Sequence, residues 1–182
     1  TDLKSSFTYG VLAHEFQHMI HWNHDRNETS WINEGFSELA AALNGYDIGG
    51  FDYYFAFEPD IQLNFWPGNE QGDSSPHYGA SYLFARYLLA QFGADTIQDI
   101  VANPKNGFEG LDEVFSNKME EYDSAWNATS KPGDQVFQNW AIANILQKDY
   151  LLNGIYGYGE EADSLPVFYP SNELNCNNDT EW

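Results

Sequence analysis

The sequence predicts a mainly α-helical protein. Several segments repeat their apolar residues at intervals of three and four, which is the period of an α-helix. Glycine, proline and asparagine stand between these segments, where they end helices and form turns. A chain of 182 residues with 42% hydrophobic and 17% aromatic side chains is long enough and apolar enough for one core. We therefore expect residues 1–182 to form a single domain, with irregular structure in the tail from about Gly154.

The first predicted helix contains the segment His14-Glu15-Phe16-Gln17-His18. Because each residue of a helix turns by about 100°, His14 and His18 share one face and can bind one tetrahedral metal ion. The apolar residues of this segment fall near the opposite side, which we expect to pack against the protein: Leu12, Phe16, Met19 and Ile20.

Two histidines at this spacing, with a carboxylate directly after the first, are typical of a catalytic zinc site. Zinc lowers the pKa of a bound water toward about 7. Glu15 would lie beside the zinc, where it can take a proton from that water and pass it to the leaving amine. The sequence therefore predicts zinc-dependent hydrolysis of peptide bonds in a protein or peptide substrate. The third protein ligand must come from another segment.

A second helical pattern runs from Trp31 to Leu43 and is also two-faced. One side is apolar, and the other carries polar side chains at helical spacing: Glu34, Ser37 and Glu38. The short connection between the two patterns would fold the second helix back beside the first. We expect this arrangement to bring Glu34 to the paired histidines as the third zinc ligand.

These segments resemble the zinc motifs of a known group of enzymes. Asn33-Glu34-Gly35-Phe36 resembles the zinc-ligand segment of aminopeptidase-N-like enzymes. Asn33-Glu34 with Ser37-Glu38 is similar to the thermolysin-like pattern, in which an aspartate stands at the position of Glu38. Both belong to the gluzincin peptidases, so the resemblance implies that Glu34 is a zinc ligand and that Glu38 holds a ligand histidine in one tautomer.

The interval from His18 to Glu34 is a few residues shorter than in those two relatives. In this respect residues 8–43 look most like secreted bacterial neutral zinc peptidases of the hyicolysin type. Enzymes of this clan have a zincin-like α+β catalytic domain in which a β-sheet lobe precedes the zinc-binding helix. The resemblance therefore implies that this chain is the C-terminal, helical part of a metallopeptidase domain, with the upstream lobe absent.

The function implied by this resemblance is that of a secreted zinc endopeptidase, and two alternatives stay open. An aminopeptidase is favoured by the match at Asn33-Glu34-Gly35-Phe36. The second alternative is a non-catalytic module in which zinc only stabilises the fold and an acidic, aromatic surface binds a partner.

Two further histidines follow the motif, and neither is the expected third ligand. His24 lies ten residues after His14, as in the metzincin motif, but that motif requires glycine where this chain has His21. If the helix continues, His24 points away from the metal. His21 stays on the metal face about one turn beyond His18, so we expect it to line the pocket or to form a hydrogen bond.

The segment from Tyr46 to Ser75 is rich in glycine and aromatic residues and is interpreted as a long structured loop that forms one wall of the substrate cleft. A third helix is expected from Pro76 to Phe92. Peptide hydrolysis at zinc passes through an oxyanion, and a tyrosine or histidine donor can stabilise it. Tyr78 or His77, at the start of this helix, is predicted to supply that donor.

The remaining helical patterns are interpreted as scaffold: residues 95–103, 108–118 and 134–148. The carboxylates of the preceding loop could bind calcium, but they lack EF-hand spacing and are better explained as solvated side chains: Asp47, Asp52, Asp60, Glu70 and Asp73. The lone Cys176 cannot form a disulfide within the chain.

The charge of the chain restricts its partners. With 28 acidic and seven basic residues, the formal net charge is −21, which argues against nucleic acids and anionic membrane surfaces. The sequence has no run of eighteen apolar residues that would indicate a membrane span. Secretion into a salty or calcium-rich medium fits this composition. The sequence makes no prediction of the oligomeric state.

Overall fold

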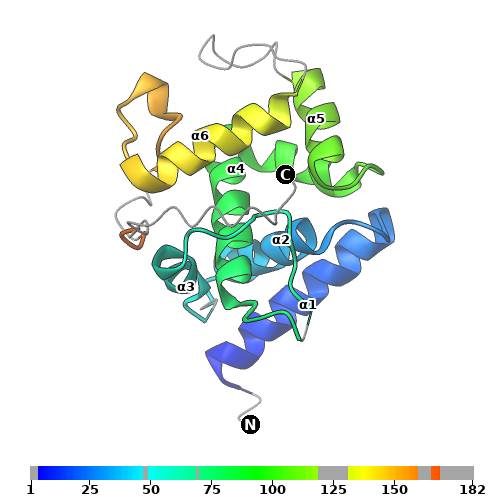
Figure 1. Cartoon of the computed structure of the whole chain (residues 1–182). Coiled ribbons are helices and arrows are strands. Elements are labelled where there is room, and N and C mark those ends of the chain that lie inside the picture. Colours follow the sequence, from blue (N-terminus) through cyan, green and yellow to red (C-terminus); the bar gives the residue numbers. More distant parts are fainter. Residues whose placement is uncertain (1–3, 47–48, 69, 119–130, 160–164, 169–182) are drawn as a thin grey trace.

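The computed structural model describes residues 4–46, 49–68, 70–118, 131–159 and 165–168 (Figure 1). These residues are mainly helical, which confirms the predicted fold class. Among them the pairing of extended backbone is limited to one isolated bridge between Lys148 and Tyr156. The helices are α1 (Ser6–His24), α2 (Ser30–Leu43), α3 (Phe51–Phe57), α4 (Ser75–Ala102), α5 (Gly107–Lys118), α6 (Pro132–Leu146) and the short 3-10 helix η2 (Leu152–Gly154).

Helices α1 and α2 lie side by side because the connection between them is short and fixed by hydrogen bonds (Figure 1). Helix α1 is capped by the Ser5 hydroxyl, which accepts from the backbone N–H of Thr8 at 3.2 Å. In the connection, the Glu28 carboxylate accepts from the Thr29 hydroxyl at 2.8 Å and from the backbone N–H of Gly107 at 2.9 Å. The turn that pairs the two helices is thereby tied to the start of α5.

Helix α4 runs through the centre of the protein and packs against α2 and α3 (Figure 1). Its buried side chains, with Leu83 and Tyr87 fully inaccessible, form the middle of the core. Gly35 of α2 permits this packing, because a Cβ atom there would lie 2.5 Å from the backbone oxygen of Ser81. The close approach of the two backbones fixes α2, and with it the neighbouring residue Glu34, on the central helix.

The segment predicted as a loop between Tyr46 and Ser75 contains a helix, α3, so that prediction is wrong in part. A helix of seven residues is too short to be stable alone, and its stability comes from tertiary packing. Gly79 of α4 provides the space, because a Cβ atom there would clash with the backbone oxygen of Phe51 at the start of α3. Gly79 lies outside the segment from Tyr46 to Ser75, so the residues of that segment alone did not predict α3.

The helices predicted from Pro76 to Phe92 and over residues 95–103 form the two parts of α4, which bends at Gly93. The backbone of Gly93 has φ 77° and ψ 173°, in a region that side chains disfavour. The other two predicted scaffold helices correspond to α5 and α6 within a few residues. In the described part of the tail from Gly154, the regular structure is the end of η2 and the isolated bridge at Tyr156, and Ile155 and Tyr158 are buried in the core.

The apolar side of α1 does not pack against the described part of the protein, contrary to the prediction. Its large side chains are 44–66% exposed: Leu12, Phe16, Met19 and Ile20. The helix instead buries Gln17 and His21 against α2. The side of α2 that meets α1 carries Glu34, Ser37 and Glu38, and these side chains contact polar residues of α1. None of the helices in the described residues is both long enough and apolar enough to cross a membrane.

Candidate metal centre

Three donor atoms from α1 and α2 converge at one point. The Nε2 atoms of His14 and His18 are 2.9 Å apart. The Oε2 atom of Glu34 lies 3.2 Å from the first and 3.4 Å from the second. Tetrahedral zinc with bonds of about 2.0–2.1 Å separates its donor atoms by about 3.3 Å. These side chains therefore have the spacing and chemistry to hold zinc, and they are the only such group of three among the described residues.

The second ring nitrogen of each imidazole, Nδ1, has a hydrogen-bond partner on the side away from the converging donor atoms. The Nδ1 atom of His14 is 3.0 Å from Oε1 of Glu38, and that of His18 is 3.0 Å from Oδ1 of Asn33. If both Nδ1 atoms carry their protons, two Nε2 lone pairs and a carboxylate oxygen face one another. Such an arrangement is repulsive unless positive charge lies among the three atoms.

The pKa values of His14 and Glu34 also indicate that positive charge is favourable between these side chains. Burial lowers the pKa of His14, but hydrogen bonds to Glu34 and Glu38 outweigh this effect and raise the pKa to about 9. Burial raises the pKa of Glu34, but its bonds to the two histidines outweigh burial and lower the pKa to about 2. In the absence of metal, a proton on the histidines supplies the missing charge, and zinc would replace it.

Glu38 lies directly behind His14 and is 6% exposed. The resemblance implied that this residue holds a ligand histidine, and the 3.0 Å contact with His14 has the geometry for that role. We predict that Glu38→Gln raises the zinc dissociation constant about tenfold, because partners behind zinc ligands contribute about 10- to 100-fold to affinity. A competition titration with a chromophoric chelator measures this change. An unchanged dissociation constant would remove Glu38 from the metal centre.

The sequence did not predict the contacts behind His18. The Ser37 hydroxyl lies 2.9 Å from Nδ1 of His18 and donates to Oε1 of Gln17 at 2.6 Å. Ser37 was expected on the inward face of α2, but its partners could not be assigned. The available signal is its position four residues after Asn33, which places both side chains on one face of the helix.

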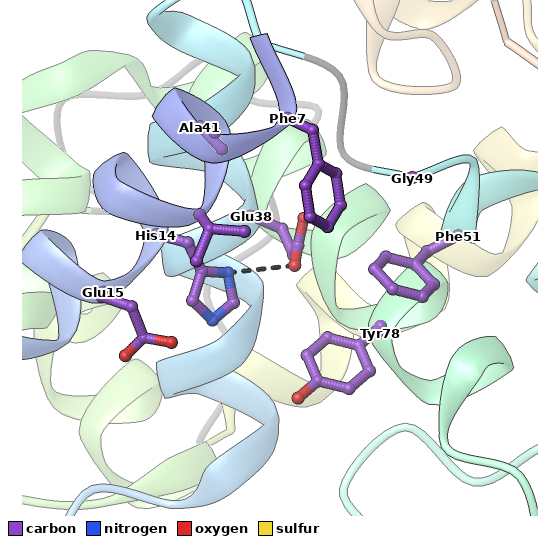
Figure 2. A pocket seen from close by; sticks show the side chains of 10 residues that line it. Phe7, His14, Glu15, Glu38, Ala41, Gly49, Phe51 and Tyr78 are labelled. Atoms are coloured by element: carbon purple, nitrogen blue, oxygen red, sulfur yellow. Dashed lines mark ion pairs between the residues drawn. The ribbon is translucent and has the colours of Figure 1, made fainter. Parts of the chain in front are cut away.

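A pocket of about 290 Å³ opens beside His14 (Figure 2). Most of the residues that line it are apolar, and its polar groups include the carboxylates of Glu15 and Glu38 and the hydroxyl of Tyr78. The apolar lining residues are Phe7, Gly10, Val11, Ala41, Gly49 and Phe51. Figure 2 shows Glu15 and Tyr78 on different sides of the His14 ring. Gly49 and Phe51 belong to the segment that was expected to form one wall of the cleft.

Tyr78, rather than His77, reaches this pocket. The ring centroid of Tyr78 lies 6.5 Å from that of His14. Burial and the negative charge of Glu34 raise the pKa of Tyr78 to about 12, so its hydroxyl keeps its proton and can donate a hydrogen bond. The ring of His77 instead lies against Phe65 and Trp66, with centroid distances of 5.8 and 6.3 Å. Of the two predicted oxyanion donors, the structure brings only Tyr78 into the wall of the pocket.

His24 and His21 do not join the metal centre. His24 is exposed and lies outside the group of donor atoms. His21 is 1% exposed and stacks on Phe36, and neither ring nitrogen has a hydrogen-bond partner. The prediction that His21 lines the pocket or forms a hydrogen bond is therefore wrong, because the helix places its ring beneath α2.

His21 makes stability depend on pH, since burial lowers its pKa from 6.5 to about 4. Between these values the unfolded chain binds a proton that the folded chain excludes, so stability falls as the pH falls from 6.5 to 4. The full effect is about 3 kcal/mol. We predict that the metal-free His21→Phe variant loses less stability than the unsubstituted chain over this range. Urea unfolding at pH 7 and pH 4.5 tests the difference, and equal losses in the two proteins would contradict it.

The carboxylates considered for calcium do not gather in the described part of the chain. Asp52, Asp60, Glu70 and Asp73 form no group of three potential ligands. Asp73 accepts from the backbone N–H and the hydroxyl of Ser75, as in a local turn. Asp47 and Cys176 lie outside the described residues.

The helical fold and the His-His-Glu group have the form expected of a metalloprotease, and similarity to a known protein supports this class. The chain is 29% identical over 133 residues to the neutral metalloprotease ShpI of Staphylococcus hyicus. The similar region covers 65% of this chain and 30% of that protein, so this chain spans less than a third of the length of its relative. No protein-family model matches the sequence.

Proposed function

We propose that the chain is the helical part of a zinc-dependent endopeptidase that cleaves proteins or peptides. The observation that carries this proposal is the convergence of His14, His18 and Glu34 at tetrahedral spacing, next to Glu15. When bound, zinc would polarise the peptide carbonyl and lower the pKa of a water toward about 7. A zinc ion held by the three donors found among the described residues would have a fourth position free for water or substrate, which is typical of catalytic rather than structural zinc sites.

Glu15 is the proposed proton carrier. Its side chain is exposed, lines the pocket beside His14 and is not one of the three converging donors. As a carboxylate it takes a proton from the attacking water and delivers that proton to the nitrogen of the departing amine. Tyr78 donates a hydrogen bond toward the negative charge that develops on the carbonyl oxygen, because its hydroxyl stays protonated.

The pocket supports a peptide substrate. A recess with mostly apolar walls next to the candidate proton carrier can hold a side chain of a bound polypeptide. The net charge of −21 supports the proposal that the protein acts outside the cell and not on nucleic acids or anionic membranes. Peptides with blocked and free amino termini distinguish an endopeptidase, which cleaves both, from an aminopeptidase, which requires the free amine.

Removal and return of the metal tests the proposed function. We expect the protein to contain one zinc per chain, to lose casein cleavage after dialysis against a chelator, and to regain it with one equivalent of zinc. Calcium alone should not restore cleavage, because the His-His-Glu donor set prefers zinc. Zinc analysis and the release of soluble peptides measure these changes. Cleavage that persists in the zinc-free protein would contradict the proposal.

A further inference from the structure

A buried hydrogen-bond network lies behind His18 and joins α1 to α2. Gln17 and Ser37 are 9% and 0% exposed. The Ser37 hydroxyl lies within hydrogen-bond distance of three groups. Its partners are Oε1 of Gln17 at 2.6 Å, the backbone oxygen of Asn33 at 2.9 Å and Nδ1 of His18 at 2.9 Å.

The number of hydrogens in this network decides which group donates to which. Ser37 has one hydroxyl hydrogen, whereas Gln17 Oε1 and the Asn33 backbone oxygen can only accept. Its hydrogen points to Gln17, the nearest acceptor, and its lone pairs remain for other contacts. Nδ1 of His18 must then donate to the hydroxyl oxygen. A hydrogen directed at His18 instead would leave the Ser37 oxygen facing two other oxygen atoms.

We propose that Gln17 and Ser37 are positioning residues that keep the proton of His18 on Nδ1, so that Nε2 presents its lone pair to the metal. This inference rests on the proposed function, because it assigns His18 as a zinc ligand. The two residues act through His18 and do not belong to the group of metal donors.

Asn33 alone does not enforce this state. Its side-chain amide has an oxygen that accepts and a nitrogen that donates, and a half-turn of the amide presents either one to Nδ1 of His18. Ser37 removes this freedom while its hydrogen is held by Gln17. Without Gln17, the hydroxyl hydrogen can turn either to the backbone oxygen of Asn33 or to Nδ1 of His18, both at 2.9 Å. In the second orientation the proton of His18 moves to Nε2, where it points at the metal position and competes with zinc.

Two substitutions break the network in different ways. We expect Gln17→Leu and Ser37→Ala each to raise the zinc dissociation constant about 10- to 100-fold. Gln17→Glu should bind zinc within about threefold of the unsubstituted chain, since a carboxylate accepts from Ser37 as the amide oxygen does. Ser81→Ala is the matched control, because Ser81 is 2% exposed, faces α2 and has no hydrogen-bond partner for its hydroxyl. It should leave zinc affinity unchanged.

A second measurement reads the tautomer without zinc. Nitrogen-15 spectra of imidazole-labelled, metal-free chain at alkaline pH give the fraction of His18 whose proton is on Nδ1. This fraction should be lower in the Gln17→Leu variant than in the unsubstituted chain, because Ser37 can then donate to Nδ1. An equal fraction in the two proteins, or zinc affinity unchanged in both Gln17→Leu and Ser37→Ala, would overturn the inference. Failure of the unsubstituted chain to bind zinc would instead contradict the proposed function, and the tautomer would still be measured.

Discussion

Glu15→Gln is expected to reduce the rate of peptide cleavage by about 10²- to 10⁴-fold while the protein keeps one zinc per chain. Glutamine has nearly the shape of glutamate, but it cannot carry a proton from water to the leaving amine, and general acid-base catalysis contributes about this much to rate. Zinc is retained because Glu15 is not one of the converging donor atoms. Cleavage of a fluorogenic peptide at saturating substrate, with zinc content measured on the same samples, gives both quantities.

Glu58→Gln is the matched control for this substitution. Glu58 is also an exposed carboxylate, but it follows α3 and is not among the residues that line the pocket. Its replacement should leave both rate and zinc content unchanged. A Glu15→Gln variant that retains more than about a tenth of the activity would show that another group carries the proton.

Glu34→Ala is expected to have the largest effect on the metal. The substitution removes the donor atom that lies 3.2 Å from Nε2 of His14 and 3.4 Å from Nε2 of His18. Loss of a partner behind a ligand weakens metal binding about 10- to 100-fold, so loss of a ligand itself should exceed about 100-fold. Zinc analysis after gel filtration in dilute chelator should find the variant empty and the unsubstituted chain loaded. Cleavage should disappear together with the metal.

Glu34→Ala and Glu15→Gln together separate the two proposed roles. The first should abolish both zinc binding and cleavage, whereas the second should abolish only cleavage. Stoichiometric zinc in an active Glu34→Ala variant would remove Glu34 from the proposed ligand set. Loss of zinc from Glu15→Gln would mean that this residue supports the metal and does not act only on the substrate.

The sequence predicted those parts of the molecule that depend on local spacing. The i, i+4 spacing of His14 and His18 and the helical pattern around Glu34 sufficed to predict that two neighbouring helices bring these side chains together. The sequence also predicted two separate helices over residues 76–92 and 95–103, and these are the two parts of α4 on either side of Gly93. In each of these cases the relevant signal lies within one helix or the short link between two.

The parts that the sequence did not reveal depend on contacts between distant segments. Helix α3 is held by its packing at Gly79, and the contacts of Ser37 and Gln17 require two helices to meet in one register. The exposed position of Phe16 follows from the same register, because α2 turns its polar face toward α1 and takes up the polar side of that helix. Periodicity identifies an apolar side, but it does not identify which side a neighbouring element covers.

Anomalous diffraction at the zinc edge, from crystals of the zinc-loaded chain, tests the central assignment most directly. We expect one strong peak at about 2.0–2.2 Å from Nε2 of His14, Nε2 of His18 and a carboxylate oxygen of Glu34, with no protein side chain at the fourth position. A peak that lacks Glu34 as a ligand, or a fourth position filled by a protein side chain, would contradict the proposed catalytic centre.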